Sequence, residues 1–292
     1  LSPNLVIHYT IKPVIYGSLA ARDLGIPFVN NITGLGTAFI KTNWLTWLVK
    51  RLYRLSQKNA DHIFFQNADD RELFISERLI PENVPQEVIP GTGIDTDHFN
   101  VCPYPKSNPV TFLLIARMLW DKGVREFVEA AREIKLEFSD VCFQLLGFLD
   151  VKNRTAISRE QMQIWVDEGI IEYLGATDDV RPYIADVDCV VLPSYREGLP
   201  RTLLEAAAMG RPIIATNVTG CREIVQDGQN GLLCKPRDAK DLAEKMKDMI
   251  ILSADERQKM GLKGRIKMEE NFDQRIIVEK IVSRIESVLN IT

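Results

Sequence analysis

The sequence predicts an α/β fold built from two doubly wound domains, each with a parallel sheet. Short runs rich in β-branched residues alternate with helical stretches along the whole chain, which is the pattern of repeated strand–helix units. Apolar residues make up 46% and charged residues 26% of the chain, a balance that suits packed cores. A length of 292 residues leaves room for two ordinary domains or one large one.

In the first half, the predicted elements follow one another as strand, helix and strand. We expect strands at residues 5–7, 27–32, 61–66 and 87–89, and helices at 14–24 and 71–77. The stretch 102–108 contains Pro103, Pro105 and several polar residues, and it has the composition of a linker between domains. We therefore place a partial first domain at 1–106.

The second half repeats the alternation more regularly. We expect one domain at 107–272 and a final segment at 273–292 that is helical over 274–289. The strand 189–192 is short, apolar and bounded by Asp188 and Pro193, which is typical of a strand buried on both faces. The other expected strands are 110–115, 141–146, 171–174 and 212–215, and the other expected helices are 124–138, 159–168, 180–185, 201–209 and 239–252.

The segment that follows strand 189–192 predicts a site for a nucleotide diphosphate. Pro200 suits the first position of a helix, and Gly210 ends that helix. A helix N-terminus at the carboxyl end of a parallel strand presents unpaired N–H groups and a partial positive charge, which favour phosphate. Glu197 and Glu205 flank this position with the spacing E-x7-E, so both are expected to face a ligand over the helix start.

A long motif in the second half resembles the signature stretch of glycosyltransferase family 4, the retaining GT-B enzymes: SYREGLPRTLLEAAAMGRPIIATNVTGCREIVQDGQNGLLCKPRD. Three further stretches extend the resemblance over nearly the whole chain: LLIARMLWDKGVREFVEAA, IPGTGIDTDHF and VIHYTIKPVIYGSLAARDLGIPFVNNITGLGTAF. The first half is most similar to bacterial transferases of capsular polysaccharide, exopolysaccharide and lipid-linked oligosaccharide synthesis. The resemblance implies two Rossmann-like domains facing a cleft, with the acceptor on the first and the nucleotide sugar on the second.

The resemblance also implies that the chain is a fragment. Family members have a glycine-rich strand-to-helix turn near the N-terminus that approaches the donor phosphates, whereas Leu1 stands directly before an internal strand. The first domain is therefore expected to be truncated. The segment 273–292 is expected to cross back and pack on the first domain.

Arg117 and Lys122 follow strand 110–115 within the family-like stretch ARMLWDKG. At the carboxyl end of the strand they could hold a leaving diphosphate, because two cations in a water-poor site stabilise its charge without a metal. On this hypothesis both residues are catalytic as well as donor-binding. The alternative is a solvated loop whose cations pair with Asp121.

The loop and the helix start supply the other donor-side residues. By resemblance, Glu205 accepts hydrogen bonds from ribose hydroxyls, and Glu197 is a catalytic residue near the transferring sugar, where it steadies positive charge at the anomeric carbon. The alternative for Glu197 is a carboxylate that only complements the helix dipole. The expected donor-binding set is Arg117, Lys122, Glu197, Gly198, Leu199, Pro200 and Glu205.

The expected acceptor-side residues are His8, Lys12, Thr33 and Gly34. Family members often carry a histidine where this chain has Thr33, and threonine cannot act as an acid or base near neutral pH. We therefore expect catalysis by positioning and charge stabilisation, with a substrate phosphate taking the acceptor's proton. His8 has a structural alternative, since histidines that end apolar strands are as often part of the core.

We expect neither a cofactor nor a metal. Asp186 and Asp188 have the D-x-D form by which other sugar transferases hold a divalent metal, but they precede strand 189–192 at its amino end, away from the ligand edge. The five cysteines form no C-x-x-C pair, which argues against zinc and favours a reduced cytosolic setting. The net charge of -4 argues against nucleic acid as a partner.

The stretch 41–58 predicts an amphipathic helix that can lie on an anionic membrane surface. The alternative is an ordinary helix packed on its own sheet. No apolar run is long enough to span a bilayer, so we expect a cytoplasmic protein with a peripheral contact through 41–58. Its apolar residues are Trp44, Trp47, Leu48, Leu52 and Leu55, and its cations are Lys41, Lys50, Arg51, Arg54 and Lys58.

Together these features predict a retaining, metal-independent glycosyltransferase of cell-envelope glycan synthesis. We expect it to move a hexosyl or N-acetylhexosaminyl group from a UDP-sugar to a lipid-linked sugar or a growing polysaccharide, and the choice of UDP rests on resemblance alone. Two alternatives remain open. A truncated chain would bind the nucleotide without turnover, and a nucleotide-sugar 2-epimerase would need acid and base groups beside Glu197, in a chain with three histidines.

Overall fold

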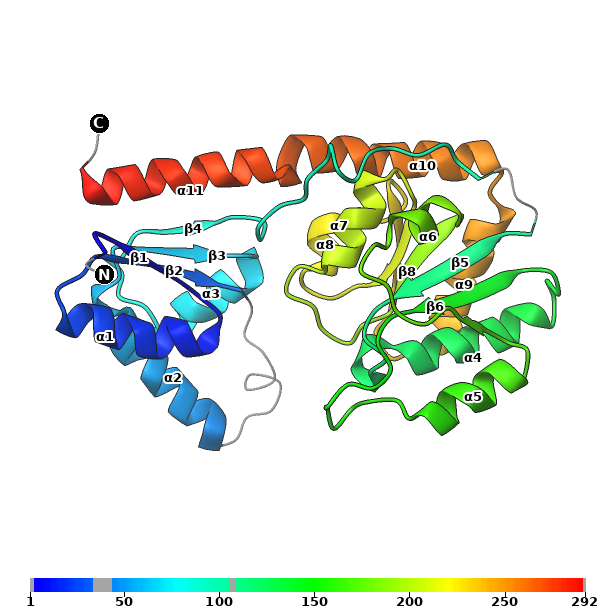
Figure 1. Ribbon diagram of the computed structural model, residues 1–292, viewed down its shortest axis with the longest axis horizontal. Helices are drawn as coiled ribbons and strands as arrows, with labels where there is room; N and C mark the ends of the chain where they lie inside the picture. Colours follow the sequence, from blue (N-terminus) through cyan, green and yellow to red (C-terminus); the bar gives the residue numbers. More distant parts are fainter. Residues whose placement is uncertain (1–2, 34–43, 106–108, 291–292) are drawn as a thin grey trace. The chain divides into compact units, whose positions relative to one another are not determined.

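The computed structural model describes residues 3–33, 44–105 and 109–290, which form two compact units (Figure 1). Unit 1 contains Leu1–Gly93 and Gln274–Thr292, and unit 2 contains Ile94–Asp273. Each unit is built around one sheet whose paired strands are all parallel. The predicted α/β class with two parallel sheets is therefore confirmed.

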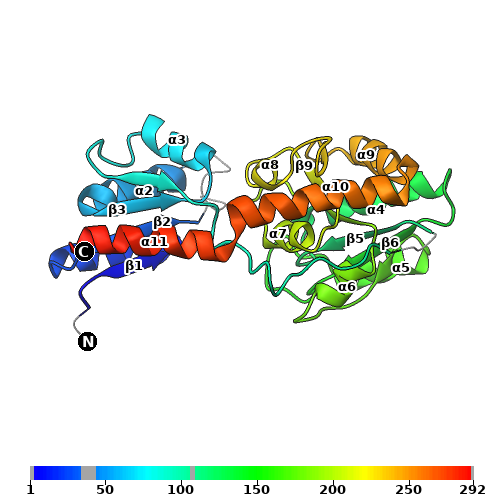
Figure 2. The same cartoon turned by 90° about the horizontal axis from the view of Figure 1, so that it is seen from above.

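Unit 1 has a four-stranded sheet in the order β1-β2-β3-β4. Helices cover one face, where Tyr53 and Phe74 pack with Phe28 and Phe65. Helix α11 covers the opposite face, where Ile277 packs among strand residues (Figure 2). The elements are β1 (Val6–Tyr9), η1 (Pro13–Gly17), α1 (Ser18–Asp23), β2 (Phe28–Ile32), α2 (Trp44–Ser56), η3 (Gln57–Asn59), β3 (His62–Phe65), α3 (Ala68–Ser76), β4 (Gln86–Val88) and α11 (Gln274–Leu289).

Unit 2 has a six-stranded sheet in the order β10-β9-β8-β5-β6-β7, with helices on both faces. The elements are β5 (Thr111–Ile115), η4 (Trp120–Lys122), α4 (Val124–Lys135), β6 (Cys142–Leu146), α5 (Arg159–Asp167), β7 (Glu172–Tyr173), α6 (Arg181–Ala185), β8 (Cys189–Leu192), α7 (Arg201–Ala208), β9 (Ile213–Thr216), α8 (Cys221–Ile224), β10 (Gly231–Cys234), α9 (Ala239–Ile251), α10 (Ala254–Lys267) and η5 (Met268–Phe272). The central strands carry apolar side chains toward both layers, which explains their continuous apolar sequences.

Strand β5 shows how the two layers are separated. Its residues Phe112 and Leu114 pack with α4, α5 and α9, whereas Leu113 and Ile115 pack with α6, α7 and α8. Successive side chains on a strand point to opposite faces, so one apolar run supplies both cores. The carboxyl ends of β5 and β8 consequently lie beside the start of α7.

The segment 94–105 belongs to unit 2, which corrects the predicted linker over its described part, 102–105. The buried guanidinium of Arg211 donates to the carbonyls of Cys102 and Pro103, and Tyr104 donates its hydroxyl to the carbonyl of Asp188 at 2.9 Å. A buried guanidinium needs such acceptors, so it fixes this segment against the unit. The division of the chain follows Gly93 rather than the predicted residue 106.

Several predicted bounds shift by one to three residues, and the predictions lack one strand, two α-helices and the short helical turns η4 and η5. The expected helix 14–24 is a π-helical turn, η1, that continues into α1, and strand β10 was not predicted. The missed α-helices are α8 and α10. None of the described helices is long and apolar enough to cross a membrane.

Candidate active site

Two loops meet at the carboxyl ends of β5 and β8, and a glycine holds them together. Gly123 ends the turn that carries Lys122 and has a φ of 73°, which favours glycine. A Cβ atom at this position would lie 2.1 Å from the carbonyl oxygen of Pro193, directly after β8. The loop of Lys122 therefore packs on the loop that leads to α7.

The loop 193–200 is fixed by three further contacts. Tyr195 donates its N–H to the carbonyl of Asp121 at 2.9 Å, and Thr216 donates its hydroxyl to the carbonyl of Ser194 at 2.5 Å. Gly220, with a φ of 77°, lies so close that its Cβ would be 2.1 Å from the carbonyl oxygen of Gly198. This loop is therefore positioned by backbone packing, as a preorganised site requires.

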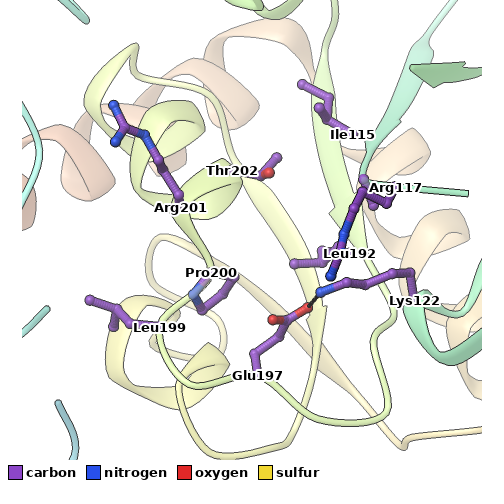
Figure 3. Close-up of a pocket in the computed structure, with 10 residues that line it drawn as sticks. Ile115, Arg117, Lys122, Leu192, Glu197, Leu199, Pro200, Arg201 and Thr202 are labelled. Atoms are coloured by element: carbon purple, nitrogen blue, oxygen red, sulfur yellow. Dashed lines mark hydrogen bonds and ion pairs between the residues drawn. The ribbon is translucent and has the colours of Figure 1, made fainter. Parts of the chain in front are cut away.

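These loops enclose a cavity of about 220 Å³. Lys122 donates from its Nζ to Oε1 of Glu197 at 2.5 Å, and Figure 3 shows the side chains of Arg117 and Lys122 pointing toward Glu197. The predicted alternative, in which the cations pair with Asp121, does not hold for Lys122, and Asp121 accepts a hydrogen bond from Thr155. The cavity is lined by Ile115, Ala116, Arg117, Lys122, Leu192, Glu197, Leu199, Pro200, Arg201 and Thr202.

The N-terminus of α7 opens onto the same cavity. Pro200 is the N-cap residue, one position earlier than predicted, and within the described part of the chain no side chain caps the helix. The next two residues, Arg201 and Thr202, line the cavity. Backbone N–H groups at an uncapped helix start, together with the cations of Arg117 and Lys122, provide an arrangement that favours a diphosphate.

Glu205 does not line this cavity, contrary to the expectation that both glutamates face one ligand position. It lies in a neighbouring hollow of about 360 Å³, which also includes His98 and Arg181. Its carboxylate accepts a hydrogen bond from Nε of Arg201 at 2.9 Å. Burial raises the pKa of Glu205, and the hydrogen bond and charge of Arg201 oppose that rise. Arg201 lines both hollows, so they adjoin.

The predicted acceptor-side residues belong to unit 1. His8 is buried, and its Nδ1 lies 2.9 Å from Oδ1 of Asn30. This agrees with the alternative interpretation, in which His8 is a structural residue of the core. Lys12 is exposed at the start of η1, and Thr33 is half-buried after β2. Gly34 lies outside the described residues. An acceptor-side role for these four positions stays a prediction.

Asp188 of the D-x-D motif is used within the fold. Its carboxylate accepts the N–H of Thr111 at 3.0 Å and pairs with Arg257 at 3.2 Å, and both charged side chains are buried. Breaking such a buried pair leaves an uncompensated charge, so the interaction fixes α10 to the start of β8. Across the part of the chain that the structure describes, no three acidic, histidine or cysteine side chains cluster as a metal would require.

The apolar residues predicted on the helix 41–58 lie largely on the outer surface of unit 1. Trp44 is 75% exposed, Trp47 58% and Leu55 51%, whereas Tyr53 is buried in the core and Leu52 packs against it. The alternative, an ordinary helix packed on its sheet through these residues, therefore holds for Leu52 but not for the exposed ones, and the membrane contact stays a prediction. The cations on α2 are partly engaged: Lys50 pairs with Glu77 and Arg51 lies over the ring of Trp47. Lys41 lies outside the described residues.

Comparisons with known proteins identify the family of this chain. The family model described as glycosyl transferases group 1 matches residues 109–251. A protein of Campylobacter jejuni, N,N'-diacetylbacillosaminyl-diphospho-undecaprenol alpha-1,3-N-acetylgalactosaminyltransferase, is 32% identical over an alignment that covers 94% of this chain and 74% of the relative. The chain belongs to the group 1 glycosyl transferases.

A further relative matches over a shorter region, and two solved structures match over nearly the whole chain. The putative colanic acid biosynthesis glycosyltransferase WcaL of Escherichia coli is 28% identical over 72% of this chain, which spans 54% of that relative. Among solved structures, HepE of Anabaena in complex with UDP has a TM-score of 0.83 at 19% identity, covering 97% of this chain and 79% of that one. Sucrose-phosphate synthase from Thermosynechococcus elongatus has a TM-score of 0.84 at 18% identity, covering 99% and 74%. The fold is GT-B.

The structure of this group 1 glycosyl transferase also identifies site residues that the sequence did not single out. Arg201 and Thr202 line the cavity, and Gly123 and Gly220 position its two loops. Their sequence signals are weak, because a glycine is informative only when its φ or its packing partner is known. Arg201 could have been found from its place in the first turn of α7, four residues before Glu205.

Proposed function

We propose that this glycosyl transferase moves an N-acetylhexosamine from a UDP-sugar to a saccharide carried on a polyprenyl diphosphate, with retention of the anomeric configuration. The main observation in support of this function is that Arg117, Lys122 and Glu197 line one cavity at the uncapped start of α7. The N-acetylgalactosaminyl transfer and undecaprenol carrier in the name of the Campylobacter relative support the choice of sugar and acceptor. The complex of HepE with UDP supports the choice of UDP as the nucleotide.

In the proposed reaction, the bond between the anomeric carbon and the distal phosphate oxygen breaks, and a bond from that carbon to an acceptor hydroxyl forms on the same face. Negative charge develops on the diphosphate, and Arg117 and Lys122 stabilise it. Glu197 stabilises the positive charge that develops at the sugar. The released diphosphate takes the proton of the acceptor hydroxyl, so the step needs no histidine base and no bound metal.

The exposed side chains of α2 support a membrane partner for the same function. Trp44, Trp47 and Leu55 present an apolar surface, and Arg51, Arg54 and Lys58 add positive charge beside it. Tryptophan and arginine in this arrangement suit the interface of an anionic bilayer. We place the protein at the cytoplasmic face of a membrane, where a polyprenyl-linked acceptor presents its sugar.

A transfer assay with paired binding measurements tests the proposal. The purified protein would be offered UDP-N-acetylglucosamine, UDP-N-acetylgalactosamine and UDP-glucose with short-chain polyprenyl diphosphate disaccharides, and products would be identified by mass spectrometry and by NMR of the new anomeric proton. UDP, GDP and ADP would be compared by calorimetry. Selective UDP binding with an α-linked product is the expected result. Binding without product would favour a nucleotide-binding module, and release of a 2-epimer would favour an epimerase.

A further inference from the structure

Arg201 connects the two hollows of the candidate active site. In Figure 3 its side chain points away from Glu197, Lys122 and Arg117, and its Nε lies 2.9 Å from Oε1 of Glu205 in the neighbouring hollow. The two partners differ in exposure, since the side chain of Arg201 is 71% exposed and that of Glu205 is 11% exposed. The exposed guanidinium of Arg201 therefore donates a hydrogen bond to the nearly buried carboxylate of Glu205.

Helix stability does not explain this placement. Arg201 is the first residue of α7, where a cation opposes the helix dipole, and it precedes its acidic partner, which is the weaker order for a pair four residues apart. A pair with one partner in solvent contributes little to helix stability. Glu205 is nearly buried, however, so the cation affects its ionisation as well as its position.

The other charged groups around the hollow do not replace Arg201. Arg181 donates to both carboxylate oxygens of Asp179 at 2.8 Å, and one of its nitrogens lies 3.4 Å from Nδ1 of His98. Asp178 also lines the hollow and adds a second negative charge beside Asp179. Burial is what raises the pKa of Glu205, and the hydrogen bond and charge of Arg201 are what oppose the rise.

We propose that Arg201 is a positioning residue for nucleotide recognition, holding the carboxylate of Glu205 ionised and turned to the wall between the two hollows. An ionised carboxylate accepts hydrogen bonds from two adjacent hydroxyls, whereas a protonated one must donate at one oxygen. The inference rests on the proposed function, because those hydroxyls are those of the nucleotide ribose. It extends that function to a residue outside the E-x7-E pair.

The experiment compares Arg201→Gln, Arg201→Lys and Glu205→Gln with the unaltered protein in two measurements. Carbon-13 NMR of the glutamate carboxyls follows the titration of Glu205 in the protein alone, and Glu205→Gln identifies its signal. Calorimetry measures the affinity for UDP-N-acetylglucosamine from pH 5.5 to 8.5. This ligand is chosen because both of its phosphates are diesters whose charge is constant over that range, so a pH dependence belongs to the protein.

In Arg201→Gln, we expect the midpoint of the Glu205 titration to rise by about one pH unit and the affinity at pH 5.5 to fall several-fold relative to the unaltered protein, with about tenfold as the upper limit that such a rise allows. At pH 8 the two affinities should agree within about threefold, and Arg201→Lys should restore most of the low-pH affinity. Melting curves of the two Arg201 variants should overlay that of the unaltered protein, because the side chain of Arg201 is exposed.

Three results would overturn the inference. An unchanged Glu205 titration in Arg201→Gln would remove the effect on ionisation. A loss of affinity that is equal at every pH would make Arg201 a direct ligand contact rather than a positioning residue. If the unaltered protein binds no UDP-sugar at pH 8, the proposed function fails and the ribose role fails with it. The NMR titration distinguishes that case, since it is measured without a ligand.

Discussion

Nζ of Lys122 lies 2.5 Å from Oε1 of Glu197, so the cation proposed to hold the diphosphate and the carboxylate proposed to face the sugar are bonded to each other. Both side chains are largely buried, with exposures of 19% and 12%. A diphosphate in the cavity would add a second, more highly charged partner for Lys122 and weaken its hold on Glu197. Binding of the donor is thereby linked to release of the Glu197 carboxylate from Lys122.

Replacing Glu197 with glutamine should separate these two roles. UDP binding should be unchanged or up to a few-fold tighter, because Lys122 loses its competing partner, while the transfer rate should fall by about 100-fold or more. Lys122→Met should weaken UDP binding by about tenfold to 100-fold, as expected for a lost charge-assisted bond. Calorimetry and product formation at saturating donor measure the two effects, and equal loss of UDP affinity in both variants would contradict them.

A methyl group at Gly220 should disturb the site from its far side. A Cβ at this position would lie 2.1 Å from the carbonyl oxygen of Gly198, so the Glu197 loop would have to shift. Gly228 is a matched control, since its φ of 71° is similar and, apart from its chain neighbours, no described atom lies within 4 Å of its Cβ position. Gly220→Ala should cost roughly 2 kcal/mol more than Gly228→Ala in urea unfolding and should abolish transfer. Equal costs in the two variants would show that the loop adapts.

The core of unit 1 should weaken in acid because of His62. Burial, followed by the charge of Arg284, lowers the pKa of His62 to about 4, while Glu87 opposes this. A lowered histidine pKa means that its contribution is present above pH 6.5 and is lost as the pH falls toward 4, by roughly 3 kcal/mol at most. Neither ring nitrogen has a hydrogen-bond partner among the residues that the structure describes, so His62→Phe should remove the acid sensitivity at little cost near pH 7.5.

Hydrogen exchange of the β2 and β3 amides at pH 5 and pH 7.5 measures this difference, because both strands lie in unit 1. Exchange rates must be corrected for the intrinsic effect of pH, which is the same for both proteins. The unaltered protein should lose protection at pH 5 that His62→Phe retains. An equal loss in the two proteins would assign the acid sensitivity to other groups.

The outer surface of α2 should mediate binding to anionic lipid. The double variant Trp44→Ser/Trp47→Ser should reduce partitioning onto phosphatidylglycerol vesicles by about tenfold or more, and Arg51→Glu should reduce it mainly at low salt. Leu136→Ser is the matched control, because Leu136 is 89% exposed in unit 2 and is not part of α2. Vesicle sedimentation measures the partitioning. Equal binding to uncharged phosphatidylcholine vesicles would count against the role of the cations.

Alternation of apolar runs and helical stretches predicted most elements of this fold, because parallel strands buried on both faces have continuous apolar sequences. Strand β8 and helix α11 have the predicted bounds. Helix α10 was missed although Ser253 and Glu256 form a complete capping box, since its own sequence is mostly polar. The linker prediction failed for 102–105 because nothing local reveals that Arg211, more than 100 residues away, donates to this segment.

The candidate site, like the fold, was predicted from the sequence only in part. The sequence predicted that Arg117, Lys122 and Glu197 follow strand ends, and strand order brings them to one cavity. The separation of Glu205 into a second hollow depends on the direction of one side chain, which the E-x7-E spacing does not determine. The sequence left two alternatives for the apolar residues of α2, a lipid surface or the core, because tryptophan and leucine fit either one. The structure shows that Trp44, Trp47 and Leu55 are exposed and that Tyr53 packs in the core.

The path of the chain through its units imposes an order on biosynthesis. Unit 2 is one uninterrupted stretch and can fold as soon as residue 273 leaves the ribosome, whereas unit 1 needs α11, which is translated after all of unit 2. Until then Val29, Phe64 and Ile89 remain uncovered on a sheet that has already been made. During elongation this nascent face is a site for chaperone binding and for aggregation, and a premature stop codon before α11 would leave it exposed permanently.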